Sequence, residues 1–309
     1  MYFQHAVIAP NLTPFNEDFT PDTALYVTHA RRLLDEGCAA LAPFGTTGEA
    51  ASLGMAERMA LLEALVSGGI EPARLVPGTG LTALPDSVTL CRHALELGVH
   101  GTMLLPPFYY KDVGDDALHA WFARLIEGVG RPEMRIYLYH IPPVARVGFS
   151  IPLVKRLAAD FPGIVVGIKD SGGDWENTAA LLGEVPGLTV FPGNELKLVR
   201  AIRSGAAGCI TATANVNAAA ISLHAGTVDA PEALEREAQV DRFRETLQRH
   251  RPIPAMKAML ARRDAHSGWM RVRPPLESLS TQALRLLEQD LEAVANTGGD
   301  FTNSRHARS

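Results

Sequence analysis

The feature that most constrains the fold is the regular alternation of short apolar runs with longer amphipathic segments. Each run is rich in Val, Ile and Leu and precedes a stretch with helical periodicity, a pattern that predicts parallel strands joined by right-handed helical crossovers. Eight such units fall within residues 6–228, which favours an α/β fold of the closed (β/α)8 TIM-barrel type over an open doubly wound sheet. The predicted strands are 6–9, 39–43, 74–77, 101–105, 135–139, 165–168, 189–191 and 208–211. The predicted helices are 22–36, 55–67, 85–97, 115–127, 151–160, 174–183, 195–203 and 217–225.

The strand pattern stops after residue 228. The segments "APEALEREAQVDRFRETLQRH", "IPAMKAMLARR" and "STQALRLLEQDLEAVAN" predict three helices separated by proline-rich links. We therefore expect residues 1–228 to form the catalytic barrel domain and residues 229–296 to form a C-terminal helical segment packed on the barrel or on another subunit. Residues 297–309 are expected to be a flexible tail.

Composition excludes several classes of function. Apolar residues make up 47% and charged residues 20% of the chain, and the net charge of −5 offers no basic surface for a nucleic acid. The N-terminus lacks a secretory signal and no stretch gives about 18 consecutive apolar residues, so we expect a cytoplasmic protein without membrane contact. Cys38, Cys91 and Cys209 are widely spaced and are predicted to be buried thiols. The histidines lack zinc-type spacing, so the sequence predicts neither a metal nor another cofactor.

Catalytic groups of such barrels come from the C-terminal ends of the strands, and Lys169 lies at one of these ends. In "GIVVGIKDSGGDW" it closes an apolar strand, where desolvation favours the neutral amine that attacks a carbonyl carbon. The alternative is a structural role, either as an ion pair with Asp170 or as a side chain that extends to solvent. Taken alone, a lysine at a strand end favours this alternative, and only accompanying residues favour catalysis.

Tyrosines follow two other strands of the predicted barrel. Tyr139, in "RIYLYHIPP", ends the strand next to that of Lys169, where its phenol is placed to shuttle protons if another hydroxyl relays them. Its alternative is an aromatic core residue. Tyr109 and Tyr110, in "PPFYYKD", lie in a proline-restrained loop, and their alternative role is packing at a subunit contact.

The stretch "GTTGE", residues 45–49, follows the second predicted strand. Thr46 and Glu49 have the spacing of a capping box, in which each side chain satisfies a backbone amide at a helix start. Thr47 is not needed for such a cap, and the flanking glycines let backbone amides approach a carboxylate. A second glycine stretch, "GTGLTA" at residues 78–83, formally resembles a dinucleotide-binding turn but lies too late in the series of strands for that role.

In their order and spacing, "APFGTTGEAASL", "PPFYYK", "YHIPP", "GIKDS" and "FPGNE…GCITATANVN" resemble the dihydrodipicolinate synthase and N-acetylneuraminate lyase (DapA-like) family of class I, pyruvate-dependent aldolases. The resemblance runs from about residue 6 to about residue 280. It implies a homotetramer of TIM barrels, each with a helical C-terminal segment, that acts on pyruvate or another 2-oxo acid together with an aldehyde.

The resemblance also implies roles for individual residues. Lys169 would form the Schiff base, and Tyr139 would be the general acid and base. Thr46 and Thr47 would hold the 2-oxo carboxylate or relay protons, which makes Thr47 a candidate for both binding and catalysis. Tyr109 would enter the site of a neighbouring subunit, although Tyr110 is close enough to confuse the assignment. A further position, Ile210, would face the substrate through its backbone carbonyl.

Departures from the family pattern bear on the substrate. Val144 stands where the synthases have an arginine that grips the second substrate's carboxylate, and Arg146 is two positions further on. Gly193 and Glu195 follow only part of the sugar-binding pattern of the sialic acid lyases. The remaining departures are Leu196 in that pattern, Ala212 in place of a serine, and His140 in place of the usual asparagine.

These departures favour an aldolase of 2-keto-3-deoxy sugar acids. The alternatives are dihydrodipicolinate synthase proper, or a dehydratase of such acids that uses the same lysine imine. A non-catalytic relative that binds a metabolite is the alternative from a different class of protein.

Overall fold

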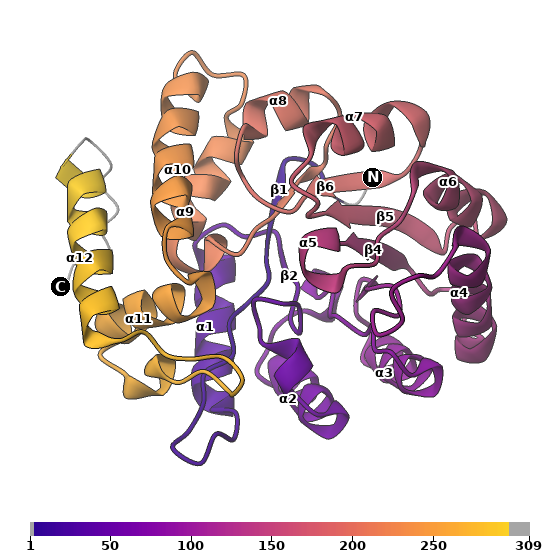
Figure 1. Ribbon diagram of the computed structural model, residues 1–309, viewed down its shortest axis with the longest axis horizontal. Coiled ribbons are helices and arrows are strands. Elements are labelled where there is room, and N and C mark those ends of the chain that lie inside the picture. The colour runs from indigo at the N-terminus through magenta and orange to yellow at the C-terminus, as the bar shows by residue number, and fades with distance from the viewer. Residues whose placement is uncertain (1–2, 297–309) are drawn as a thin grey trace.

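The computed structural model describes residues 3–296, in which parallel strands and helices alternate around a central barrel (Figure 1). The strands are β1 (Ala6–Ala9), β2 (Ala40–Leu41), β3 (Thr102–Leu104), β4 (Ile136–His140), β5 (Val165–Asp170), β6 (Thr189–Pro192) and β7 (Gly208–Ile210). The helices that accompany them are α1 (Thr23–Asp35), α2 (Met55–Ser67), α3 (Leu84–Glu96), α4 (Asp115–Val129), α5 (Pro142–Ala145), α6 (Ile151–Asp160), α7 (Trp175–Glu184), α8 (Leu198–Arg203) and α9 (Ala214–Gly226). The C-terminal helices are α10 (Ala233–Gln248), α11 (Pro252–Asp264) and α12 (Thr281–Asn296).

The strand predicted over 74–77 does not form as a regular element. A 3₁₀ turn occupies Pro72–Arg74, and Pro77 has no N–H to donate to a ladder, which breaks the pairing into isolated bridges. The extended segment still fills its place in the barrel, because the Val76 N–H donates to the Leu41 carbonyl at 2.9 Å and the Met103 N–H donates to the Pro77 carbonyl at 2.8 Å. This segment connects β2 to β3.

The strands form two parallel sheets, in the orders β2-β1-β7 and β3-β4-β5-β6. The extended 75–78 segment joins these sheets between β2 and β3. Between β6 and β7 they are joined by a hydrogen bond from the Ala207 N–H to the Val190 carbonyl, at 3.0 Å. With β2 connected to β3 and β6 to β7, the described residues form a closed barrel of eight positions. The predicted TIM-barrel fold is therefore confirmed.

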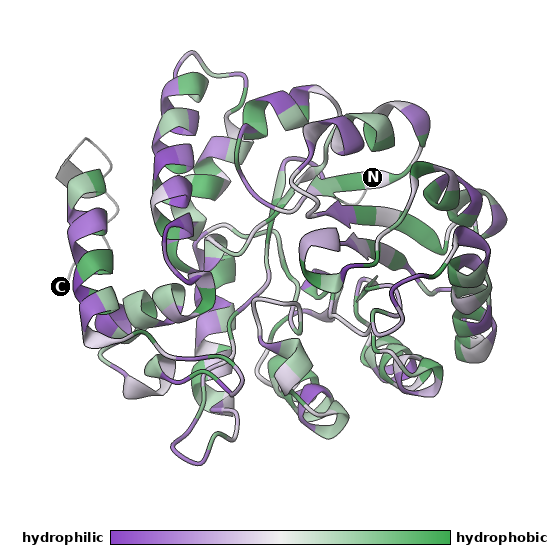
Figure 2. Cartoon of the chain, in the orientation of Figure 1, coloured by the Kyte–Doolittle hydropathy of each residue, from purple (hydrophilic) through white to green (hydrophobic). Residues whose placement is uncertain are grey.

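The barrel interior is filled by inward-facing side chains from the strands and from the 75–78 segment. The strands are mostly hydrophobic, and polar residues gather on the outer faces of the surrounding helices (Figure 2). This alternation follows from the side-chain period of two in a strand and the one apolar stripe of each helix. The buried interior residues are Phe3, Ala6, Ile8, Ala40, Ala42, Val76, Met103, Tyr137, Tyr139, Phe191, Ala207 and Ile210.

Close backbone approach explains the glycines of "GTGLTA". A Cβ atom on Gly78 would lie 2.1 Å from the Phe44 carbonyl oxygen, and one on Gly80 would lie 2.6 Å from the Leu105 nitrogen. Only glycine lets neighbouring segments pack at these distances. The resemblance to a nucleotide-binding turn is thus a consequence of barrel packing.

Two helix starts differ from the predictions. The helix predicted from residue 195 begins at Leu198, because Glu195 is fully buried and Lys197 takes a left-handed backbone with φ 56°. The helix predicted from 217 begins earlier, at Ala214, and is kinked at Asn217, where φ is −145°. Both departures lie on loops at the C-terminal ends of strands, where the chain adopts irregular backbone.

The helices α10, α11 and α12 lie together on one side of the barrel, beside α1 and α9 (Figure 1). Trp269, which is fully buried, packs edge-on against His29 of α1 with ring centroids 4.9 Å apart. The ion pair between Arg32 and Asp264, at 2.8 Å, also joins α1 to the end of α11. The tail predicted over 297–309 lies outside the described residues. From residue 3 to residue 296, the structure has no helix of the length and apolar character needed to cross a bilayer.

Candidate active site

Lys169 and Tyr139 are neighbours on the inner face of the barrel. β4 and β5 pair in parallel with Tyr139 opposite Lys169, so both side chains point to the same face. Both are buried, with exposed fractions of 4% and 3%. The Lys169 Nζ lies 4.3 Å from the centroid of the Tyr139 ring, within cation–π range. An amine and a phenol are thus held side by side at the C-terminal end of two adjacent strands.

Asp170 takes no part in this pair, because the next side chain along a strand points to the opposite face. Its carboxylate accepts hydrogen bonds from the Gly172 N–H at 3.0 Å, the Asn177 amide at 3.0 Å and the Thr178 hydroxyl at 2.7 Å. These bonds fix the loop between β5 and α7. No ion pair among the described residues includes Lys169, so the alternative of a Lys169–Asp170 ion pair is not realised.

A hydroxyl from the loop after β2 contacts the Tyr139 phenol. The Thr46 Oγ1 lies 3.2 Å from the Tyr139 hydroxyl, and either group can donate. Thr46 is exposed whereas Thr47 is 9% exposed, so the two threonines point into different surroundings. Of the two, Thr46 is the one that contacts the phenol. Sequence reasoning left this relay role open between them.

The predicted capping box between Thr46 and Glu49 does not form. Glu49 has a left-handed backbone with φ 57°, and its buried carboxylate accepts from the Lys257 ammonium and from the Arg273 N–H. The side chain therefore points into the protein and away from the Thr46 backbone. The capping contact is made further on, where the Gly54 N–H donates to Glu57 at 2.9 Å before α2.

The backbone around the two threonines is held in an unusual conformation by its neighbours. Phe44 on one side and Glu49 on the other have positive φ values, 61° and 57°, which cost of order 1–2 kcal/mol each for residues with a Cβ. A Cβ on Gly48 would lie 2.8 Å from the Asn11 carbonyl oxygen, and the Thr13 hydroxyl donates to the Gly48 carbonyl at 2.8 Å. Contacts from distant parts of the chain therefore hold this loop in one conformation.

Ile210 and Gly193 lie near this site on the remaining barrel wall. Ile210 ends β7, is fully buried and belongs to the same interior cluster as Tyr139. The Gly193 N–H donates to the Asp170 carbonyl at 2.6 Å, and a Cβ there would lie 2.0 Å from the Ser171 hydroxyl. Gly193 thus allows the loops after β5 and β6 to approach each other.

Glu195, predicted as a substrate-binding residue, lies inside the wall of the barrel. It is fully buried, its carboxylate accepts from the Thr211 hydroxyl, and the Arg244 guanidinium lies 3.8 Å away. Arg244 in turn donates to the Thr213 hydroxyl at 2.7 Å. These contacts connect the loop after β7 to α10.

Tyr109 and Tyr110 lie on the loop after β3 and are 72% and 73% exposed. Their rings contact each other edge-on, with centroids 5.4 Å apart. Within the described part of this single chain, no recorded contact joins either ring to Tyr139 or Lys169. A role in this chain's own site is therefore not supported.

The end of β4 and the loop after it carry two of the departures noted in the sequence, His140 and Val144, and the nearby Arg146. Val144 is 61% exposed, and Arg146 is exposed and ends α5 with φ 59°. His140 accepts a hydrogen bond at Nδ1 from the Phe149 N–H at 3.0 Å, which requires an unprotonated Nδ1. Desolvation lowers the pKa of His140, and the Asp170 carboxylate opposes this shift. His140 thus fixes the loop as a neutral side chain.

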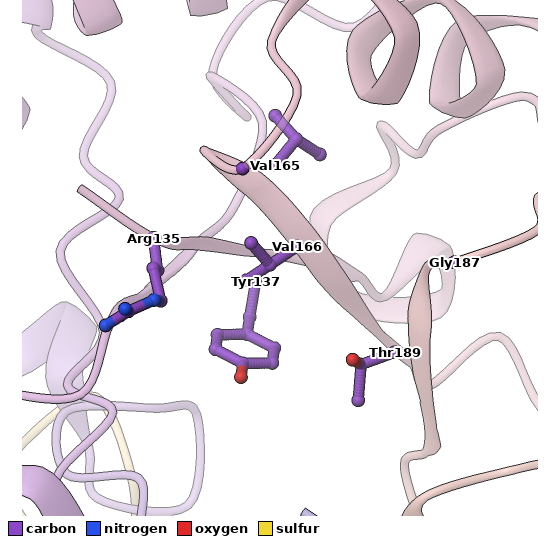
Figure 3. Close-up of a pocket in the computed structure, with 7 residues that line it drawn as sticks. Arg135, Tyr137, Val165, Val166, Gly187 and Thr189 are labelled. Carbon is purple, nitrogen blue, oxygen red and sulfur yellow. The ribbon is translucent and has the colours of Figure 1, made fainter. Parts of the chain in front are cut away.

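A cavity of about 390 Å³ lies at the opposite end of the barrel (Figure 3). The residues that line it are Arg135, Tyr137, Gly163, Val165, Val166, Gly187 and Thr189. Val165 is the first residue of β5 and Lys169 the fifth, a separation of about 13 Å along a strand. This cavity is therefore distinct from the Lys169 site.

Comparisons with known proteins find relatives over nearly the whole chain. The model of the Dihydrodipicolinate synthetase family matches residues 4–294. An uncharacterized DapA-like lyase from Chloroflexus aurantiacus is 37% identical over 207 residues, which are 67% of this chain and 69% of that protein. The crystal structure of dihydrodipicolinate synthase from Agrobacterium tumefaciens is 36% identical, with a TM-score of 0.86 over 94% of this chain and 99% of that one. YagE from E. coli K12, solved in complex with pyruvate, shares the fold at 22% identity, with a TM-score of 0.85 over 94% of this chain and 98% of that one.

Proposed function

Because the chain belongs to the dihydrodipicolinate synthetase family, an enzyme family of class I, pyruvate-dependent lyases, we propose that Lys169 forms a Schiff base with a 2-oxo acid. The observation that carries the proposal is the arrangement of three groups from separate strands and loops. The buried Lys169 amine lies 4.3 Å from the Tyr139 ring, and the Tyr139 hydroxyl lies 3.2 Å from Thr46. A nucleophile, an acid–base group and a relay hydroxyl thus adjoin one another.

The reaction follows from the chemistry of an imine. The Lys169 amine adds to the C2 carbonyl of pyruvate, and the carbinolamine loses water to give a protonated imine. The imine withdraws electrons, so a C3 proton can leave and an enamine forms. The enamine carbon attacks an aldehyde to form the new C–C bond, the alkoxide takes up a proton, and water releases the product from the lysine. Cleavage follows the same steps in reverse.

The other side chains have separate roles in this proposal. Tyr139 gives and takes protons at the carbinolamine and alkoxide oxygens, with Thr46 as the relay. Thr47 and the Gly193 region bind the acid, and the Ile210 carbonyl faces the bound molecule. Glu195, because it is buried against Thr211, would act by supporting the wall of the site.

We further propose that the substrates are 2-keto-3-deoxy sugar acids, cleaved to pyruvate and an aldehyde. This is supported by the exposed apolar side chain of Val144, where the synthases are expected to place a guanidinium. The likeness to dihydrodipicolinate synthase of A. tumefaciens keeps that activity as the alternative. Pyruvate release from a panel of 2-keto-3-deoxy acids, and pyruvate consumption with a panel of aldehydes, would separate these two activities. Loss of water without loss of pyruvate would indicate the dehydratase.

The exposed pair of tyrosines supports a homotetramer in which a neighbour's Tyr109 completes the site. Two rings exposed by 72% and 73% form an apolar surface that association would cover. Sedimentation gives the assembly directly. Tyr109→Phe and Tyr110→Phe, compared in turnover at equal oligomeric state, identify which phenol acts. A fully active monomer would refute this part of the proposal.

The central experiment is reductive trapping. The protein is incubated with pyruvate and borohydride, and the modified peptide is identified by mass. We expect the adduct on Lys169, and no adduct and no turnover in Lys169→Ala. Lys155→Ala, which removes a lysine from an exposed ion pair with Glu184, is the control and should be labelled as the wild type is. An unmodified Lys169 in wild-type protein that turns over substrate would exclude the Schiff base, and absence of both adduct and turnover would favour the non-catalytic alternative.

A further inference from the structure

A buried ion pair connects the threonine loop to the C-terminal helices. Lys257 of α11 is fully buried, and its ammonium donates to the carboxylate of Glu49 and to the Arg271 carbonyl, the latter at 2.6 Å. The same ammonium lies 4.4 Å from the centroid of the Phe15 ring. The side chains of Lys257 and Glu49 are 1% and 0% exposed, so water cannot replace either partner.

The Lys257–Glu49 pair is better explained by the arrangement of chain segments that it fixes than by a contribution to the free energy of unfolding. Desolvation lowers the pKa of Lys257 to about 8, and the Glu49 carboxylate opposes the shift. Two charges removed from water recover little net free energy from each other, and apolar replacements of buried pairs are often no less stable. A pair that is costly to bury can, however, fix one arrangement of the segments it joins.

The segment fixed here is the one that carries the site threonines. The other Glu49 oxygen accepts from the Arg273 N–H at 2.8 Å, so both oxygens are bound by the C-terminal segment. Glu49 itself has the left-handed backbone, and its N–H donates to the Thr46 carbonyl at 3.1 Å. Glu49 is thus bonded both to the C-terminal segment and to the turn that carries Thr46 and Thr47.

We propose that Lys257 is a positioning residue for the reaction: by holding Glu49, it places Thr46 against Tyr139 and Thr47 toward the 2-oxo acid. This inference rests on the proposed function for its catalytic consequence. It assigns to the C-terminal segment a role in the site, although no contact within residues 3–296 joins that segment to Lys169 or to the Tyr139 hydroxyl.

The experiment separates positioning from stability with three variants, Lys257→Met, Glu49→Gln and the two combined. Each single change leaves one buried charge without its partner and should raise the equilibrium constant of unfolding by about 100-fold or more. The combined variant has no unpaired charge, and its glutamine can still accept from the Arg273 N–H, so we expect most of this stability to return. Its half-saturating pyruvate concentration in borohydride trapping should nevertheless stay raised by about tenfold or more. Recovery of both stability and pyruvate affinity would overturn the inference.

A matched control removes another ion pair that joins α1 of the barrel to α11. Arg32→Met breaks the contact with Asp264, whose side chain is 17% exposed, at the far end of the same helix. We expect it to lower stability and to leave the half-saturating pyruvate concentration unchanged. An equal loss of affinity in this control would show that any loosening of α11 has the effect, and would overturn the specific role of Lys257.

Hydrogen exchange gives a readout that does not depend on pyruvate. The amides of Gly48, Glu49 and Ala50 are bonded within the loop, and we expect the peptide covering 44–54 to exchange faster in the combined variant than in the wild type or in Arg32→Met. Absence of trapping in the wild type would refute the proposed function, and the exchange rates would still decide the positioning role. Unchanged protection of this peptide in the combined variant would refute that role.

Discussion

Thr46→Val is the change that most directly tests the proton relay. Valine keeps the β-branched shape of threonine and removes only the hydroxyl that lies 3.2 Å from the Tyr139 phenol. Thr46 is exposed, and its side chain has no other recorded hydrogen bond among the described residues, so the folded protein should lose little stability. Thr46→Ser, which keeps the hydroxyl, is the matched control.

The size of the effect distinguishes two roles for this hydroxyl. If Thr46 only orients the phenol, the loss is that of one hydrogen bond, about 0.5–1.5 kcal/mol, or about 2–10-fold in rate. If Thr46 carries the proton, the loss should approach that of a general acid–base group, about 10²–10⁴-fold. We expect the larger effect, because no other hydroxyl is recorded within hydrogen-bond distance of the Tyr139 phenol in the described chain.

The assay requires only pyruvate. Reversible enamine formation exchanges the methyl protons of pyruvate with solvent, and the exchange rate in heavy water can be followed by proton magnetic resonance. Borohydride trapping in the same samples reports imine formation separately. We expect Thr46→Ser to keep most of the wild-type exchange rate and Thr46→Val to lose it.

A wild-type exchange rate in Thr46→Val would refute the relay. A loss below about tenfold would reduce Thr46 to an orienting contact. Equal losses in the serine and valine variants would point to altered loop packing, since the hydroxyl is kept in one of them.

Three further predictions follow from single sites. Tyr139→Phe should lower the exchange rate by about 10²–10⁴-fold at unchanged stability, and an unchanged rate would make the tyrosine a packing residue. Burial and the nearby Arg32 lower the pKa of His29 from 6.5 to about 3. Between these two pH values the unfolded chain binds a proton that the folded protein does not. The free energy of unfolding should therefore fall as the pH falls from about 6.5 to about 3, by up to ~1.4 kcal/mol per pH unit. Denaturant titrations of the wild type and His29→Gln check this, and equal acid slopes would contradict it. Gly208→Ala should cost about 2–5 kcal/mol, because φ is 137° and the new Cβ would lie 1.9 Å from the Ala6 carbonyl oxygen; Gly183→Ala, in open space on α7, is the control and should not destabilise.

Much of the secondary structure could be predicted from periodicity alone. The helices Met55–Ser67 and Ile151–Asp160 have the predicted bounds, because an uninterrupted amphipathic pattern identifies a helix locally. The strand predicted over 74–77 did not form as a regular element. A strand pairs through its own N–H groups as well as its carbonyls, and Pro77 has no N–H. The helix predicted from 195 failed because burial of Glu195 overrode its helical preference.

Prediction from the sequence was least successful for polar residues whose partners lie far away in the chain. Glu49 matched a local capping box, yet its partner is Lys257, 208 residues further on. The only local signal for Lys257 was a cation within an apolar helical stretch, "IPAMKAML". Such a residue must find a buried partner, but the sequence gives no means of identifying which carboxylate that is.

By itself, the sequence determined the barrel, its order of elements and the strand ends at which Lys169, Tyr139 and Thr46 stand, because periodicity and strand polarity are local properties of the chain. The tertiary structure decided which of these groups touch. It placed Thr46 against the phenol and turned Asp170 outward, and it tied the threonine loop to α11 through Lys257. These outcomes depend on strand register, backbone handedness and contacts across the fold, which are fixed only when the whole barrel closes.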